Sequence, residues 1–169
     1  MSGIQGRERL QPSLIDRLTD DAPTRLKDAP DAMTMSSAQL RRSVLRDLAH
    51  LLNTSNLSTI EDLSATPLAA QSTLNYGIPG FAGLTESASR TMSLERELAE
   101  AIKHFEPRIR PESIRVHARG ARDDSAIPSL VFIIEGELWA QPVPQQLFLE
   151  TTIEVETRIA VVTDSKEVR

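Results

Sequence analysis

The segment Phe105-Glu106-Pro107-Arg108-Ile109 divides the sequence into a helical part and a strand-like part. Before it, apolar residues recur with the spacing of helices, and after it they alternate with a period of two. Pro107 disfavours helical geometry at Glu106, so a helix should end there. The opposite charges of Glu106 and Arg108 stand beside apolar residues and therefore need partners, either inside the fold or on another molecule.

The first helix is predicted over residues 37 to 52. Ser36 followed by Gln39 has the form of a capping box, which supports a start at this point. The apolar residues of this stretch recur at three- and four-residue spacing, which places them on one helix face. They are Leu40, Val44, Leu45, Leu48, Leu51 and Leu52.

A second helix is predicted to begin at Pro67, a favoured residue at the first helical position, and to finish before Gly77. Leu68 and Leu74 are expected to form its buried edge, with Tyr76 as a further candidate. The residues after Gly77 are expected to turn, with Gly80 in the positive-φ conformation that a type II turn requires.

A third helix is predicted over 93–105, and three antiparallel strands follow near 114–117, 130–139 and 147–155. The apolar stretch 159–162 either extends the last strand or forms a fourth. Because the helices come first and the strands afterwards, we predict an α+β fold in which about three helices cover one face of a small antiparallel sheet of three to four strands.

Residues 1–35 carry three prolines and mixed charge, which indicates a flexible N-terminal arm. Within the arm, residues 13–18 are expected to form a short capped turn whose Leu14, Ile15 and Leu18 dock on another surface. The alternative is a frayed terminus that touches its own domain. Residues 36–163 are predicted to form one domain, and residues 164–169 a C-terminal tail.

Composition narrows the classes of function. The chain has no cysteine, which excludes disulfides and thiolate metal sites and fits a reducing compartment such as the cytoplasm. Its net charge of −5 argues against a nucleic-acid binder. His50, His104 and His117 lie on separate predicted elements, so we expect neither a metal nor a cofactor. No apolar stretch approaches the length of a membrane span, and residues 1–18 lack the apolar core of a secretory signal.

Catalysis has little support in the sequence. A glycoside hydrolase would need two carboxyl groups across a cleft, one of them protonated. Glu106 is the candidate, but the nearby Arg108 would favour its ionised form, which is wrong for a general acid. A series of five glutamates in the predicted strands is interpreted as the solvated face of a sheet. These are Glu135, Glu137, Glu150, Glu154 and Glu156.

Three segments occur together in one order: 43–54, 74–79 and 101–108. They carry Ser-Val-Leu-Arg-Asp-Leu followed by Leu-Leu-Asn-Thr, then Leu-Asn-Tyr-Gly-Ile-Pro, then Ala-Ile followed by Phe-Glu-Pro-Arg. In this order the segments resemble the TssE family of baseplate proteins of the bacterial type VI secretion system. That family is similar to a contractile-phage baseplate wedge protein historically labelled lysozyme-like. Residues 14–18 match the Leu-x-Asp-Arg-Leu motif of the TssE family. The resemblance extends to about Val162.

The resemblance implies a structural, non-enzymatic subunit without cofactor or metal, cytoplasmic and assembled at the inner membrane. Its implied partners are other wedge proteins, of the TssF, TssG and TssK type, and sheath subunits, with no nucleic acid and no membrane insertion. The family's docking motif corresponds to Glu106, Pro107 and Arg108. Further residues are expected to contribute to partner binding. These are Leu14, Asp16, Arg17, Leu18, Arg46, Asn75, Tyr76 and Gly77.

The same resemblance implies a role in starting the contractile sheath. An edge strand offers unpaired backbone groups to which a partner strand can add. The expected template is Gln146–Glu156 or Ile159–Val162.

Three alternatives remain open from the sequence. Glu106 and Arg108 can form a salt bridge inside the chain instead of facing a partner. The chain can be a peptidoglycan hydrolase, as the lysozyme-like label suggests. It can also be an adaptor that uses only the basic side of the first helix, formed by Arg41, Arg42 and Arg46.

Overall fold

The computed structural model describes residues 12–19, 23–24, 35–80, 88–121, 129–139, 144–154, 157 and 159–165, and the structural statements below concern these residues. The described α-helices are α1 (Leu14–Leu18), α2 (Ser37–Leu52), α3 (Pro67–Ala70) and α4 (Ala88–Phe105). Short 3₁₀ turns are η2 (Leu57–Thr59), η3 (Thr73–Asn75) and η4 (Pro111–Ser113). The strands are β1 (Arg115–Ala121), β2 (Ser129–Leu138), β3 (Gln145–Glu154) and β4 (Ala160–Asp164).

The four strands form one antiparallel sheet in the order β1-β2-β3-β4. The stretch near 159–162 therefore makes a fourth strand and does not extend the third. β1 and β4 are the edges, and β3 is paired on both sides over Leu149–Ile153. Of the two expected templates for strand addition, the β3 segment is thus an inner strand, and β4 is the edge on that side.

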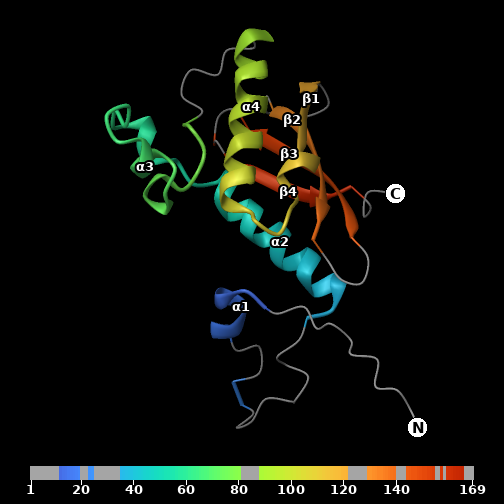
Figure 1. Cartoon of the computed structure of the whole chain (residues 1–169). Helices are drawn as coiled ribbons and strands as arrows, with labels where there is room; N and C mark the ends of the chain where they lie inside the picture. Colours follow the sequence, from blue (N-terminus) through green and yellow to red (C-terminus); the bar gives the residue numbers. More distant parts are fainter. Residues whose placement is uncertain are drawn as a thin grey trace, which may run out of the picture.

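α2 and α4 lie over one face of the sheet, α4 toward β1 and α2 along β4 (Figure 1). Between the two layers lies the apolar core, in which Leu48 and Leu98 from the helices meet Phe132 and Ile134 from β2. Burial of each such side chain contributes roughly 1.5–3 kcal/mol. The predicted α+β fold, with helices on one face of an antiparallel sheet, is confirmed.

The predicted bounds of α2 are also confirmed. The Ser36 hydroxyl accepts a hydrogen bond from the Gln39 backbone N–H at 3.2 Å, and the Gln39 side chain accepts one from the Ser36 N–H at 2.7 Å. This reciprocal arrangement is the predicted capping box, which satisfies two donors at the helix start. Five of the six predicted residues of the apolar stripe are buried in the core, and Leu45 is partly buried against it.

α4 ends at Phe105 as predicted but begins at Ala88, five residues before the expected start at Ser93. Ser93 does not cap the helix, because its hydroxyl donates to the Glu97 carboxylate one turn later, at 2.7 Å. The helix therefore continues toward its N-terminus through residues 88–92, which contain neither proline nor glycine.

The predicted second helix is wrong in its extent and in its burial. α3 begins at Pro67 but has only four residues, and η3 follows as a separate turn. The Ser72 hydroxyl donates to the Ala69 carbonyl and accepts from the Leu74 N–H, and such local bonds replace those of a continuing helix. Leu68 and Leu74, expected to be buried, are 85 % and 71 % exposed.

The positive φ belongs to Gly77, at 121°, and not to Gly80 as predicted. Residues 77–78 run against the end of α2, where the Ile78 N–H donates to the Thr54 carbonyl at 2.9 Å and the Ile78 carbonyl accepts from the Asn56 N–H at 3.0 Å. A Cβ at Gly77 would lie 2.3 Å from the Thr54 oxygen. Glycine is therefore required by close approach as well as by backbone conformation.

The face of the sheet opposite the helices carries the predicted glutamates. Glu135 and Glu137 are partly exposed, as expected. Glu150 is instead buried, and it accepts a hydrogen bond from the Arg119 guanidinium at 3.1 Å. Glu156 lies outside the described residues.

No helix among those described combines the length and the hydropathy that crossing a membrane requires.

Candidate functional site: a groove at the helix-to-strand corner

The corner between α4 and the sheet is built around Pro107. The Glu106 N–H still donates to the Ile102 carbonyl at 2.9 Å, as the last bond of the helix. Proline then stops the helical pattern, and the Ile109 N–H donates back to the Glu106 carbonyl at 3.1 Å, which closes a tight turn. Ile109 is buried and bridges to Leu138 of β2, so the turn is fixed to the sheet.

Arg108 is bound almost entirely within its own chain. Its Nε donates to Glu106 Oε1 at 2.6 Å, and its Nη2 donates to both Glu106 Oε2 and Asp47 Oδ2, at 2.5 and 2.6 Å. Its Nη1 donates to the Ser43 hydroxyl at 2.8 Å. Glu106 is only 2 % exposed, whereas the Arg108 side chain is 23 % exposed. A two-pronged pair of this kind fixes the guanidinium in one orientation.

The charge network continues from α2 to α1. The Ser43 hydroxyl donates to Asp16 Oδ2 at 2.9 Å, so Ser43 lies between the Asp16 carboxylate and Arg108. Arg46 donates to Asp16 Oδ1 at 2.6 Å and to Asp47 Oδ1 at 2.8 Å. We call this network the corner cluster. Its members are Asp16, Ser43, Arg46, Asp47, Glu106 and Arg108.

The cluster shifts the pKa values of Asp16 and Arg108. Burial alone would raise the pKa of Asp16, but hydrogen bonds from Ser13, Arg46 and Ser43 outweigh it and lower the pKa from 3.8 to about 2. Burial would lower the pKa of Arg108, yet the bonds and charge of Glu106, together with those of Asp47, raise it. Both groups are therefore charged throughout the physiological range.

A groove of about 700 Å³ lies beside the corner cluster, between α1 and the body of the domain. Tyr76 and Phe105 pack edge to face in its wall, with ring centroids 5.2 Å apart at 67°. Burial, followed by the charges of Asp47 and Glu106, raises the pKa of the Tyr76 hydroxyl. The lining is mainly apolar and includes Pro107 at the rim. It consists of Ser13, Leu14, Ile15, Met35, Leu40, Asp47, Leu48, His50, Leu51, Tyr76, Phe105, Glu106, Pro107 and Arg108.

Comparison with known families identifies the chain. A family model described as "Baseplate wedge protein gp25" matches residues 38–143, more than half of the sequence, including the corner. The chain belongs to the baseplate wedge protein gp25 family. This is the family of TssE, so the resemblance derived from the three segments is confirmed. Neither the curated proteins nor the solved structures yielded a match.

Family membership supports a structural role in a baseplate. The local chemistry is consistent with that role, because Glu106 and Asp47 both pair with the Arg108 guanidinium. A general acid would instead need a protonated carboxyl group. Within the described part of the chain, no group of three histidine or acidic side chains is arranged to hold a metal ion.

The groove brings together many residues that the sequence predicted for partner binding in this gp25-family chain. Leu14, Tyr76, Glu106, Pro107 and Arg108 line it. Asp16 and Arg46 are not in the lining but belong to the adjoining corner cluster. Four predicted residues belong neither to the groove lining nor to the corner cluster: Arg17, Leu18, Asn75 and Gly77.

Asn75 and Gly77 are engaged inside the chain. Asn75 Oδ1 accepts from the Ser58 N–H at 2.8 Å, and its Nδ2 donates to the Ala70 carbonyl at 2.9 Å. Gly77 allows residues 77–78 to approach α2. Both residues therefore hold the position of Tyr76, which itself faces the groove.

Sequence reasoning did not assign Ser43 and Asp47 to the site. Ser43 is 5 % exposed and lies three residues after Leu40, on the apolar stripe of α2. A polar residue on such a stripe needs a hydrogen-bond partner when it is buried. A serine on the apolar stripe was therefore the sequence signal that could have identified Ser43 as part of the site. Asp47, by contrast, lies off the stripe, where a solvated charge is the usual outcome.

Proposed function

We propose that this gp25-family chain is a TssE-type baseplate subunit of a type VI secretion machine. In this role it joins wedge proteins of the TssF, TssG and TssK type on the cytoplasmic side of the inner membrane and has no catalytic activity. The family match supports the baseplate role. The ordered segments at 43–54, 74–79 and 101–108 support the type VI assignment because they resemble the TssE family. All three contribute side chains to a single groove.

The groove is the proposed docking site for a wedge partner. Glu106 and Arg108 satisfy each other, so the pair contributes by fixing the shape of the corner and not by offering a free charge. The exposed Pro107 ring and the apolar wall with Tyr76 and Phe105 then contact the partner. Burial of apolar groups in a preformed groove supplies affinity at a low ordering cost.

The proposed sheath contact uses the β4 edge. Because ladder bonds alternate along an antiparallel strand, the N–H and C=O of Ala160 point away from β3. The Asn53 side-chain amide binds both groups. Its Oδ1 accepts from the Ala160 N–H at 2.9 Å, and its Nδ2 donates to the Ala160 carbonyl at 2.8 Å. This is the donor and acceptor pattern of a neighbouring strand. An incoming sheath strand replaces Asn53 and continues along β4.

The docking role is tested by co-producing the full chain with its wedge proteins and measuring how much of them co-purifies. Pro107→Ser removes the ring at the rim without changing charge, and Arg108→Ala disrupts the corner cluster. Each is expected to reduce co-purification at least tenfold. Arg110→Ser is the matched control, since Arg110 lies on the same turn but pairs with Glu137 outside the groove.

Thermal melts of each purified variant separate loss of docking from loss of folding. If folded Pro107→Ser and Arg108→Ala variants join the wedge as well as the wild type does, the groove is not the docking site. If the wild-type chain fails to join the wedge at all, the proposed function is wrong.

A further inference from the structure

A second surface lies outside the groove, on residues 57–75, which we call the knob. It comprises η2, α3 and η3 and projects to the side of the helix layer (Figure 1). Three large aliphatic side chains on these elements face solvent: Ile60, Leu68 and Leu74 are 79 %, 85 % and 71 % exposed. Covering these three side chains with a partner would remove apolar surface from water, which is favourable.

The knob is held in shape by side-chain hydrogen bonds. Asn56 Oδ1 accepts from the hydroxyls of Ser58 and Thr59, at 3.0 and 2.9 Å. Asn75 joins η2 to the end of α3 through its bonds to the Ser58 N–H and the Ala70 carbonyl. The aliphatic side chains are therefore presented on a fixed backbone, which reduces the entropy lost when a partner binds.

Charge in this part of the chain has one sign. The chain contains 19 lysine and arginine residues, yet none of them, and no histidine, occurs between Leu51 and Ser89. The charged residues of the knob are Glu61 and Asp62, and both are exposed. A partner surface with complementary charge must therefore supply a cation.

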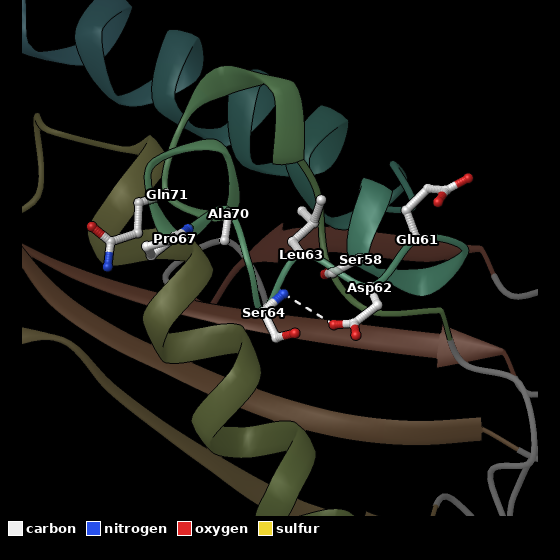
Figure 2. Close-up of a pocket in the computed structure, with 8 residues that line it drawn as sticks. All are labelled: Ser58, Glu61, Asp62, Leu63, Ser64, Pro67, Ala70 and Gln71. Carbon is white, nitrogen blue, oxygen red and sulfur yellow. Dashed lines mark hydrogen bonds between the residues drawn. The ribbon is translucent and has the colours of Figure 1, made fainter.

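The knob also contains an open hollow of about 410 Å³ (Figure 2). Leu63, Pro67 and Ala70 give it aliphatic walls, and Asp62 and Ser64 stand together at its edge. Asp62 Oδ1 accepts from the Ser64 N–H at 3.0 Å. This bond lowers the pKa of Asp62. A lysine or arginine suits these walls, because its stem packs on apolar groups while its charged end reaches a carboxylate.

We propose that the knob is a second docking surface, for a baseplate protein whose contact patch is apolar and carries a lysine or arginine that enters the hollow beside Asp62. Leu68 and Leu74 pack against the apolar part of that patch. The identity of the partner as a baseplate protein rests on the proposed function. The surface itself is separate from the corner groove, since the two share no lining residue.

Site-specific photo-crosslinking in the full chain, co-produced with its wedge proteins, tests this inference. A photoreactive residue is placed in turn at Leu68, at Pro107 in the groove rim, and at Glu100, an exposed position on α4 that serves as the control. Position 68 is expected to crosslink to a wedge protein with at least tenfold the yield of position 100. The double variant Glu61→Lys, Asp62→Lys should reduce that yield about fivefold, whereas Glu100→Lys should not change it.

The outcomes separate the two proposals. Crosslinks from position 107 without crosslinks from position 68 would overturn the knob surface and leave the proposed function standing. Absence of crosslinks from both, with folded protein, would count against the proposed function. A crosslink from position 68 to another copy of this chain would replace the wedge partner with self-association, and an unchanged yield in the charge-reversed variant would exclude the basic side chain.

Discussion

The corner cluster and the knob differ in burial from what their residue types suggest: charged side chains are buried or partly buried in the corner cluster, and leucines are exposed on the knob. The corner contains five charged side chains, yet Glu106 is buried and Arg108 directs its donors to its own chain. The knob contains leucines typical of a core, yet Leu68 and Leu74 lie in solvent. Charges that find complete partners can be buried, whereas apolar side chains stay exposed where no other element packs on them.

The difference indicates how each region can take part in assembly. In the proposed docking roles, the corner contributes through its shape, because its charges are already satisfied within the chain and their loss would disturb the fold. The knob is proposed to contribute through exposed side chains that add little to the stability of the fold. Changes at the corner should thus affect stability strongly, and changes at the knob should affect only binding.

The largest effect is expected from Glu106→Ala. The variant removes the main partner of Arg108, and we expect a loss of about 3 kcal/mol in the free energy of unfolding, at the low end for a broken buried pair because Arg108 keeps Asp47. Urea denaturation followed by circular dichroism measures it. Glu100→Ala, which breaks an exposed pair with Lys103, should cost less than about 0.5 kcal/mol. Equal losses in the two variants would contradict a structural role for the corner.

Gly77→Ala tests the link between the corner and the knob. A Cβ there would overlap the Thr54 carbonyl at a φ that alanine rarely adopts, so we expect a loss of about 2 kcal/mol in unfolding free energy. Gly80→Ala should cost less than about 1 kcal/mol, because φ there is not positive and the nearest atom is the Thr59 methyl group at 3.0 Å. Calorimetric melts compare the two variants. A larger loss of unfolding free energy in Gly80→Ala than in Gly77→Ala would contradict the assignment of the steric constraint to Gly77.

Asp16→Asn examines the outer part of the corner cluster. Because the pKa of Asp16 falls from 3.8 to about 2 on folding, its contribution is present above pH 4 and is lost as the pH falls toward 2. We expect a contribution of about 1 kcal/mol, because solvent screens the pair with Arg46. Hydrogen exchange at the Thr19 amide, which donates to the Ile15 carbonyl, reports on α1 directly. The exchange rate at Thr19, corrected for the intrinsic rate, should rise between pH 5 and pH 3. An unchanged rate would show that the Asp16 carboxylate does not hold α1 in place.

The smallest effect is expected from Leu68→Ser. With 85 % of Leu68 exposed, the unfolding free energy should change by less than about 0.5 kcal/mol. Leu48→Ala in the core of α2 is the matched contrast and should cost about 2–5 kcal/mol. If Leu68→Ser destabilises the domain by more than about 1 kcal/mol, the leucine supports the knob itself and is not free to bind a partner.

The sequence predicted the long elements well and the 57–80 region poorly. α2 and the end of α4 followed from periodicity, a capping box and a proline, which are signals carried by neighbouring residues. In the 57–80 region, serine, threonine and asparagine side chains compete with the backbone for hydrogen bonds, and periodicity does not describe that competition. Leu68 and Leu74 were misplaced for this reason.

The candidate site was predicted in part. Glu106 and Arg108 were singled out as charges beside a helix-breaking proline, and Leu14 as part of a capped turn. The resemblance gave Glu106, Pro107 and Arg108 a docking role and added Tyr76, and all of these residues line one groove. Ser43 and Asp47 were not assigned, because their roles depend on the Arg108 guanidinium 65 and 61 residues further along the chain. Local patterns carry no information about such pairings.

The sequence alone determined the order of the long elements and the break at Pro107, because each depends on residues close together in the chain. It also determined the family, because the three segments at 43–54, 74–79 and 101–108 can be recognised by their order without knowledge of the fold. Only the tertiary structure decided that Arg108 binds Glu106, Asp47 and Ser43, that β4 is an edge, and that the knob leucines face solvent. These outcomes depend on which distant groups meet when α2, α4 and the sheet pack. Burial and electrostatic pairing are properties of that packing and not of any single segment.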